Sequence, residues 1–255
     1  MPRLIQRPLR LLVLTWLLGV SSSAMAVDLR LAVAANFTDT ARKLMAAFAD
    51  TTGLEASASY GSTGKLYAQI RNGAPFDVFL AADSRRPELL EQQGLGLPGS
   101  RFTYARGTLV LWSPEPDTLA TPEAWLAAGD FKRLAMANPK TAPYGLAAQQ
   151  VLAHLELWQP LQPKLVRGES IAQAFQFVAT SNAQAGFVAL AQVIAWPGPE
   201  GALWRIPREY YSPVNQQAIL LSHGRENDAA HQWLTFLHSP RAQRIIQQYG
   251  YDTSD

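Results

Sequence analysis

The stretch SYGSTGKLYAQI, residues 59–70, contains two small hydroxyl residues, Ser62 and Thr63, each beside a glycine. Such a stretch suits two kinds of anion site: a nucleotide-phosphate loop, or a helix N-terminus that holds a small oxyanion. A phosphate loop requires a glycine five places before the Gly-Lys pair and a serine or threonine directly after the lysine. Here position 59 is serine and the lysine is followed by leucine, so this motif is absent. Hydroxyl residues at a helix start remain, and they favour anion binding.

Three other turns between predicted strands and helices carry similar signals. Asn36 in AANFTD is predicted to cap a helix, and Pro143 in NPKTAPYG fits a first helical position. In RGESIAQ, either Ser170 or Glu169 could cap a helix whose first N–H belongs to Ile171. Each signal alone is typical of an ordinary cap. Because such turns meet at one edge of an α/β sheet, the four together predict a small-oxyanion site.

The elements that must position these turns alternate between short apolar strands and amphipathic helices, which favours mainly parallel sheets with helices on both faces. A long strand, YARGTLVLWSP, begins near residue 104, and the units after it form a second set. A later strand, 213–221, and two C-terminal helices would return the chain to the first set. The sequence therefore predicts two lobes with two hinge crossings. The first lobe is expected to comprise residues 27–104 and 218–255, and the second 105–217.

The first 26 residues have the pattern of an export signal. Arginines at positions 3, 7 and 10 precede the apolar run LLVLTWLLGV, and Ala24-Met25-Ala26 offers a small-residue cleavage site. The alternative, a membrane anchor, is disfavoured because the run is shorter than the roughly 18–20 residues that span a bilayer. We expect cleavage after Ala26 and a soluble mature protein in the periplasm.

Composition excludes several other classes of protein. Removal of the three signal arginines changes the formal net charge from +2 to −1, and the remaining bases are scattered. A nearly neutral chain has no electrostatic footprint for nucleic acid. The sequence contains no cysteine, which excludes disulfides, thiolate chemistry and cysteine-based metal sites.

Several motifs, in the same order along the chain, resemble the periplasmic molybdate-binding proteins of ABC importers. They are LAVAANFT, SYGSTGKLYAQI, GAPFDVFLAADS, NPKTAPYGLAA, SIAQAFQFVATSNAQAGFVAL and YYSPVNQQAILL. The likeness covers nearly the whole mature chain. It implies a type II periplasmic binding protein fold that captures molybdate or tungstate and delivers it to the membrane permease subunits of an ABC importer. It also implies a monomer with no enzyme activity and no cofactor, in which molybdenum enters only as the bound oxyanion.

The resemblance further implies that uncharged donors hold a tetrahedral dianion. Some relatives use a tyrosine hydroxyl after a GIVY-like strand, but here that strand reads GFVAL and Ala189 takes the tyrosine's place. Tyr144 could supply the hydroxyl from another turn. The first turn has Ala35-Asn36 where others have two hydroxyl-type residues, so the identity of the remaining backbone donors stays open. Carried over by position, the ligand-binding residues are Asn36, Ser62, Thr63, Tyr144 and Ile171, the last through its backbone N–H.

Charged residues near these turns allow two interpretations. Lys65 could neutralise the anion or lie on the outer face of its helix, and we favour the outer face because the implied ligand shell is uncharged. Asp77 and Asp83 flank the predicted strand FDVFLAA. A carboxylate facing a dianion would repel it, so we expect these two residues to form hydrogen bonds at the sheet end.

Alternative functions remain open at the sequence level. Another tetrahedral oxyanion, such as sulfate, would suit the same fold. A periplasmic hydrolase is less favoured, because the G-x-S-x-G elbow is absent and none of the four histidines forms an H-E-x-x-H pair. The effector domain of a cytoplasmic regulator can share the fold, but the export signal argues against it. The sequence does not separate molybdate from tungstate.

Overall fold

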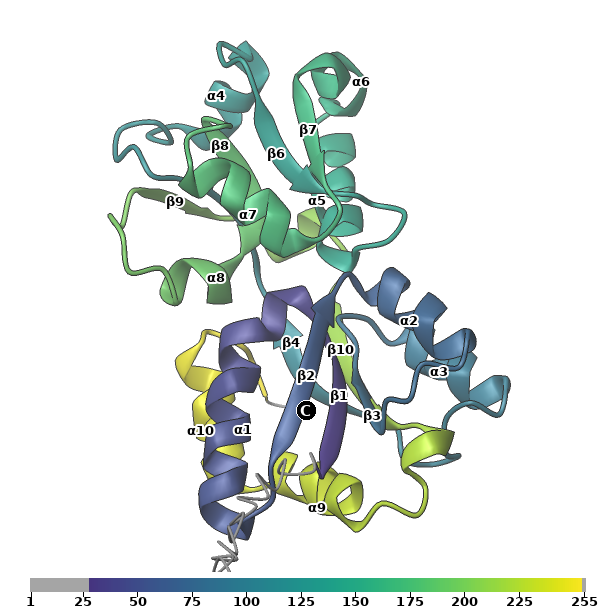
Figure 1. Cartoon of the computed structure of the whole chain (residues 1–255). Coiled ribbons are helices and arrows are strands. Elements are labelled where there is room, and N and C mark those ends of the chain that lie inside the picture. Colours follow the sequence, from purple (N-terminus) through teal and green to yellow (C-terminus); the bar gives the residue numbers. More distant parts are fainter. Residues whose placement is uncertain (1–27, 254–255) are drawn as a thin grey trace, which may run out of the picture.

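The computed structural model describes residues 28–253, so the predicted export signal lies outside the described residues. The described strands form two separate sheets of five strands each. Helices flank both sheets, and Figure 1 shows the two resulting units one above the other. We call the unit that contains β1 the first lobe and the unit that contains β5 the second lobe.

The sheet of the first lobe has the order β2-β1-β3-β10-β4. Its inner strands are apolar and buried, as expected of strands covered on both faces. The strands are β1 (Leu29–Ala34), β2 (Ala56–Gly61), β3 (Val78–Leu80), β4 (Phe102–Gly107) and β10 (Val214–Leu220). The helices are η1 (Ala35–Phe37), α1 (Thr38–Thr52), α2 (Thr63–Arg71), α3 (Arg85–Gln92), η4 (Ser222–Gly224), α9 (Asp228–Leu237) and α10 (Pro240–Gln248).

The sheet of the second lobe has the order β7-β6-β8-β5-β9. Its strands are β5 (Leu109–Ser113), β6 (Leu134–Ala137), β7 (Leu165–Gly168), β8 (Ala185–Ala189) and β9 (Ala202–Arg205). The helices are α4 (Pro122–Ala128), α5 (Pro143–His154), α6 (Trp158–Leu161), η2 (Gln162–Lys164), α7 (Ile171–Ala179), α8 (Leu190–Ile194) and η3 (Arg208–Tyr210). Each lobe has its own apolar core, in which buried residues of the strands pack against the helices.

The chain crosses between the sheets twice, as predicted. The first crossing is at Thr108, between β4 and β5, and the second lies between β9 and β10. The prediction of one long strand from residue 104 is wrong, because the strand ends at Gly107 and a new strand in the other sheet begins at Leu109. The predicted lobe limits at residues 104 and 218 fall inside β4 and β10, both of which belong to the first sheet.

The sheets are mixed rather than mainly parallel. In the first sheet β1 runs parallel to β2 and β3, whereas β10 runs antiparallel to β3 and β4. In the second sheet β5 runs antiparallel to both of its neighbours. The reason is the crossings: β5 and β10 each enter a sheet from the other lobe, not through the crossover helix that makes neighbouring strands parallel.

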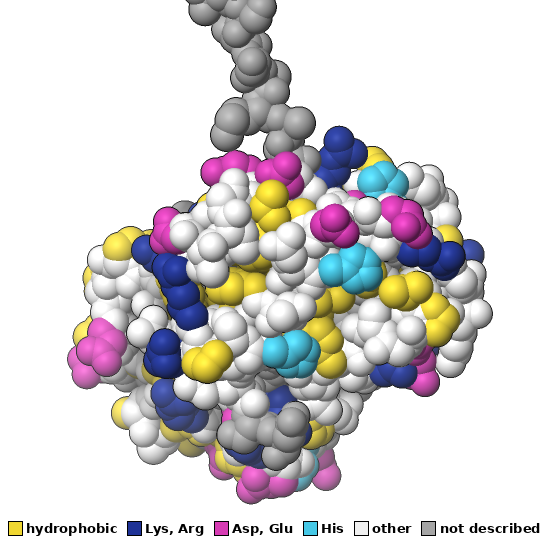
Figure 2. All heavy atoms as spheres, turned by 90° about the horizontal axis from the view of Figure 1, so that it is seen from below, with side chains coloured by type: hydrophobic (Ala, Val, Ile, Leu, Met, Phe, Trp, Pro, Cys, Tyr) yellow, Lys and Arg dark blue, Asp and Glu magenta, His cyan; other side chains and the backbone are white. Residues whose placement is uncertain are grey.

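The sequence predicts that basic residues are scattered over the surface. Figure 2 shows one face of the molecule, on which acidic, basic and histidine side chains are interspersed among neutral ones. Among residues 28–253, no helix is both long enough and apolar enough to cross a membrane.

Candidate anion-binding site

The starts of four helical segments, η1, α2, α5 and α7, meet at one small cavity between the lobes. The cavity volume is about 10 Å³, far below the roughly 300–1,000 Å³ of sites for drug-sized ligands. A small ion therefore suits it better than a sugar or a peptide. The cavity is lined by Ala34, Ala35, Asn36, Gly61, Ser62, Thr63, Ala82, Ala142, Pro143, Tyr144 and Ile171. The structure thus brings together all five residues that the sequence singled out for the ligand.

The pairing of parallel strands explains why these distant segments converge. Ala34 and Gly61 are register partners at the ends of β1 and β2, so the turns into η1 and α2 lie side by side. Ala137 and Gly168 pair in the same way at the ends of β6 and β7, before α5 and α7. Ligands bind outside the carboxyl ends of strands in such sheets. Each lobe therefore supplies two turns to the cavity.

Ser62 and Thr63, at the start of α2, are almost fully buried. The Thr63 hydroxyl oxygen accepts a hydrogen bond from the backbone N–H of Ala82 at 3.1 Å. Since the oxygen is used as an acceptor, the hydroxyl hydrogen is available to a ligand. The Ser62 hydroxyl is buried and has no hydrogen-bond partner among the described residues. A buried hydroxyl without a partner is unfavourable, so both side chains suit a ligand that accepts hydrogen bonds.

Tyr144 is the corresponding residue of the second lobe. Pro143 is the first residue of α5, as predicted, so the first N–H group of this helix belongs to Tyr144. The Tyr144 side chain is 1% exposed, and its hydroxyl has no hydrogen-bond partner among the described residues. Burial raises the pKa of Tyr144 well above its usual value, and the adjacent Asn36 side chain opposes part of that rise. The phenol therefore stays protonated and can donate at neutral pH.

Ile171 begins α7, and Ser170 caps this helix as one of the two predicted alternatives. The Ser170 hydroxyl accepts from the backbone N–H of Gln173 at 3.3 Å. Gln192 braces the same turn, because its side chain donates to the Ile171 carbonyl at 3.3 Å and accepts from the Ala189 N–H at 3.1 Å. Ala189, which replaces the tyrosine of some relatives, thus belongs to the support of α7 and does not line the cavity.

The prediction that Asn36 caps a helix is wrong. Neither η1 nor α1 has a side-chain cap, and their N-cap residues are Ala34 and Phe37. The Asn36 amide nitrogen instead donates to the Gln216 side chain at 2.8 Å and to the Tyr251 hydroxyl at 3.1 Å. These two bonds use both amide hydrogens. Asn36 can therefore offer a ligand only its backbone N–H, at the start of η1.

Two residues that hold Asn36 in place, Gln216 and Tyr251, were not predicted from the sequence. Gln216 is completely buried, and its side-chain oxygen also accepts from the Tyr104 hydroxyl at 3.2 Å. The Tyr251 hydroxyl donates to the Asn36 carbonyl at 2.8 Å. The sequence offers only a weak signal for Gln216, because it is one of three consecutive polar residues in β10, where the pairing with β4 shifts register. Register irregularities of this kind are common beside functional sites because they re-aim side chains.

No aspartate, glutamate, histidine, lysine or arginine lines the cavity. Lys65 is absent from the lining and forms an ion pair of 2.8 Å with Glu169 of the second lobe. Asp77 accepts from the backbone N–H of Arg30 at 2.7 Å and contacts His223, and Asp83 pairs with Arg86. The expectation that both aspartates form hydrogen bonds at the sheet end is confirmed.

The two lobes touch directly beside the cavity. The backbone N–H of Gly64 in α2 donates to the carbonyl of Thr141, before α5, at 2.9 Å. The Arg86 guanidinium donates to the Lys140 carbonyl at 3.3 Å. These two bonds join the lobes next to lining residues of the cavity, Thr63 and Ala142.

The chemistry of this site is that of a binding pocket. It offers hydroxyls, backbone N–H groups and the positive ends of helix dipoles, all of which favour an anion. The lining contains no histidine, carboxylate or lysine that could act as a general base. Among residues 28–253 there is also no cluster of three or more potential metal ligands.

Comparisons with known proteins agree with this chemistry. Residues 29–252 match the family model described as bacterial extracellular solute-binding protein. The chain is 48% identical to the molybdate-binding protein ModA of Azotobacter vinelandii over 91% of this chain and 92% of the relative. It is 45% identical to ModA of Rhodobacter capsulatus over 94% of both chains. The solved structure of the Azotobacter vinelandii periplasmic molybdate-binding protein superposes with a TM-score of 0.85 at 43% identity, covering 89% of this chain and all of the other. The chain therefore belongs to the bacterial extracellular solute-binding protein family, and within it to the group of molybdate-binding proteins.

Proposed function

We propose that this protein captures molybdate between its two lobes in the periplasm and delivers it to the permease subunits of an ABC importer. As a member of a solute-binding family it is a receptor and not an enzyme, and its oxyanion is a ligand, not a cofactor. The relatives named molybdate-binding proteins support the identity of the ligand. Tungstate, a tetrahedral dianion of similar size, would use the same donors. We expect the receptor to act as a monomer.

One observation carries the proposal: two buried hydroxyls without partners, Ser62 from the first lobe and Tyr144 from the second, line the same uncharged cavity. A buried polar group left unpaired costs about 1–3 kcal/mol. An oxyanion between the lobes would satisfy both groups together. A cation or an apolar ligand would satisfy neither, since each hydroxyl would still lack an acceptor.

We assign the donors as follows. Ser62, Thr63 and Tyr144 donate through their hydroxyls. Asn36 and Ile171 donate through backbone N–H groups, because the Asn36 amide is already engaged and the Ile171 side chain is apolar. The first N–H groups of a helix have no partner inside it, so α2, α5 and α7 each add donors and a partial positive charge.

Selectivity would follow from the fixed positions of these donors. Sulfate is smaller, so several donors would lie too far from its oxygens. Two such losses would lower the affinity on the order of a hundredfold, at about 1–3 kcal/mol each. Phosphate carries a proton near neutral pH and needs an acceptor for it. A shell of hydroxyls and backbone N–H groups that all donate to the anion offers few acceptors, so phosphate would bind weakly.

Thermal melting with a panel of oxyanions tests the proposal. At about 100 times its dissociation constant, molybdate should stabilise the protein by about 2.7 kcal/mol. Tungstate should act similarly, whereas equal concentrations of sulfate or phosphate should shift the melting temperature little. If sulfate stabilised the protein as strongly as molybdate, the assigned ligand would be wrong. If none of the four anions changed the melting temperature, the site would not be an oxyanion site at all.

A further inference from the structure

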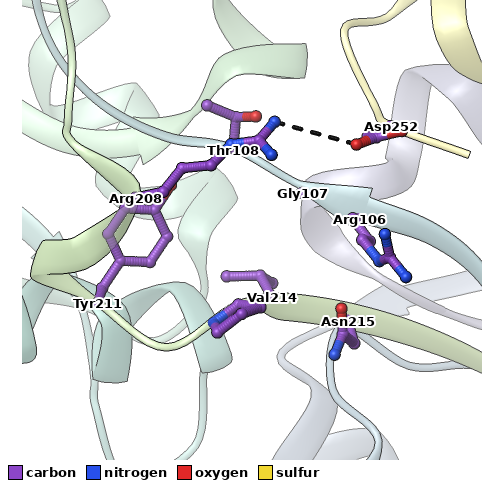
Figure 3. A pocket seen from close by; sticks show the side chains of 9 residues that line it. Arg106, Gly107, Thr108, Arg208, Tyr211, Val214, Asn215 and Asp252 are labelled. Atoms are coloured by element: carbon purple, nitrogen blue, oxygen red, sulfur yellow. Dashed lines mark ion pairs between the residues drawn. The ribbon is translucent and has the colours of Figure 1, made fainter. Parts of the chain in front are cut away.

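Gly107 ends strand β4, directly before the first crossing between the lobes. Figure 3 shows it between Arg106 and Thr108 on the connecting strand, opposite Val214 and Asn215 of β10. The Tyr144 ring, which comes from α5 of the second lobe, packs against this residue. A Cβ atom at position 107 would lie closer than 3.0 Å, a distance that real Cβ atoms essentially never show, to both the hydroxyl oxygen and Cζ of Tyr144.

The backbone does not require glycine here. The φ angle of Gly107 lies outside the left-handed region, whereas seven other glycines of the described chain have positive φ. Alanine could therefore adopt the conformation of residue 107 without backbone strain. The reason for a glycine is instead the space that the missing side chain leaves beside the strand.

Two side chains share this space. Besides Tyr144, the side-chain nitrogen of Gln216 would lie closer than 3.0 Å to an added Cβ. The Gln216 side-chain oxygen holds Asn36, and Asn36 lines the anion cavity. The space beside Gly107, which we call the notch, therefore lies next to Gln216 of the first lobe and contains the Tyr144 hydroxyl of the second lobe.

Tyr144 and Gly107 belong to different lobes, so their contact depends on how the lobes are arranged. We propose that Gly107 is a positioning residue for anion binding: the notch left by its missing side chain admits the Tyr144 hydroxyl when the cleft closes. A side chain at this position would hold Tyr144 away from the cavity and disfavour the closed, ligand-bound state. Within the first lobe, the same side chain would also press on Gln216. The inference rests on the proposed function and adds a closure requirement to it.

The test is a double-mutant cycle between Gly107→Ala and Tyr144→Phe, with molybdate affinity measured by calorimetry. Because the added methyl group overpacks the contact with Tyr144, Gly107→Ala should raise the Kd for molybdate roughly ten- to a hundredfold. The Tyr144→Phe background lacks the oxygen atom that lies nearest the added Cβ but keeps Cζ and Gln216, so there the same substitution should raise the Kd by a clearly smaller factor. Equal effects in both backgrounds would overturn the proposal.

The control is Thr108→Ala, which alters the side chain of the next residue, at the crossing itself. Thr108 does not line the anion cavity, and its side chain forms no hydrogen bond in the described part of the chain. This variant should bind molybdate like the wild type. The melting temperature of ligand-free Gly107→Ala should also stay close to that of the wild type. A large fall would mean that the contact with Tyr144 persists in the open protein or that the contact with Gln216 disturbs the first lobe, and either result would contradict a role confined to closure.

Spin labels separate failure of this inference from failure of the proposed function. The sequence contains no cysteine, so Glu88→Cys in α3 and Ala153→Cys in α5 introduce one label site in each lobe. With molybdate, the wild-type background should show a short inter-lobe distance, and Gly107→Ala should retain a long one at the same concentration. No molybdate binding by the wild type would reject the proposed ligand. Binding by both proteins with the same distance distribution would reject only the role of Gly107.

Discussion

Ser62 is the residue at which stability and ligand binding can be separated most cleanly. Its hydroxyl is buried and has no partner among the described residues, so it costs free energy in the closed arrangement unless an anion binds there. We predict that Ser62→Ala lowers molybdate affinity roughly ten- to a hundredfold, as loss of about 1–3 kcal/mol implies. The free energy of unfolding without ligand should stay the same or rise. Calorimetry and urea denaturation measure the two quantities.

Ser100→Ala provides the control for this prediction. The Ser100 hydroxyl lies outside the cavity and forms two bonds, to the Leu97 carbonyl at 2.7 Å and from the Leu220 N–H at 3.2 Å. Its removal should lower stability and leave molybdate affinity unchanged, the reverse of the Ser62 result. A loss of stability in Ser62→Ala without a loss of affinity would show that its hydroxyl serves the fold and not the ligand.

The role of a site residue was predictable where neighbouring residues in the sequence determine it. Thr63 and Ser170 lie at helix starts because small hydroxyl residues favour those positions. The role of Asn36 was not predictable, since its amide bonds to Gln216 and Tyr251, which lie 180 and 215 residues away. A single sequence read locally carries no information about such contacts. The same limit applies to Gly107, whose notch depends on a tyrosine of the other lobe.

At the scale of elements, the start of α7 must be held rigidly for its first N–H groups to serve an anion. Ser170 caps this helix through Gln173. We predict that Ser170→Ala lowers the free energy of unfolding by about 1 kcal/mol, the usual cost of a lost cap. It should also weaken molybdate binding several-fold, because Ile171 is the first residue of the loosened turn. Thermal melting and calorimetry give the two values.

The chain offers a matched control in another helix. Ser239 caps α10 in the same way, by accepting from the Ala242 N–H at 3.2 Å, but α10 packs on the first lobe away from the cavity. Ser239→Ala should cost about the same stability and leave molybdate affinity unchanged. If both variants weakened binding equally, the effect would reflect global stability and not the geometry of α7.

The order of elements was predictable from apolar periodicity, whereas their pairing was not. Alternating strands and helices indicated two α/β units, and two five-stranded sheets are present. The mistaken long strand at residue 104 shows why pairing is harder. In YARGTLVLWS, Thr108 alone separates β4 from β5, and only tertiary pairing assigns the two strands to different sheets. The antiparallel direction of β5 and β10 likewise follows from the crossings and not from any property of their residues.

At the scale of the whole molecule, the two crossings make the cavity a shared property of both lobes. Asn36, Ser62 and Thr63 come from the first lobe, and Tyr144 and Ile171 come from the second. A ligand that needs donors from both lobes stabilises the closed arrangement over the open one by differential binding. We therefore propose that the closed protein is the form that a permease receives. The ion pair between Lys65 and Glu169 is exposed and contributes little to this balance.

The most direct test is a crystal structure of the molybdate complex, with the metal located by its anomalous scattering. We expect one strong molybdenum peak between the starts of η1, α2, α5 and α7. The anion's oxygens should lie about 2.7–3.2 Å from the Ser62 hydroxyl and from the backbone nitrogen of Ile171. A peak elsewhere would contradict the assigned site. One such place is the pocket of Figure 3 beside the first crossing, whose lining includes Arg106, Thr108 and Arg208. A peak at the predicted place whose contacts came from one lobe alone would also contradict the proposal.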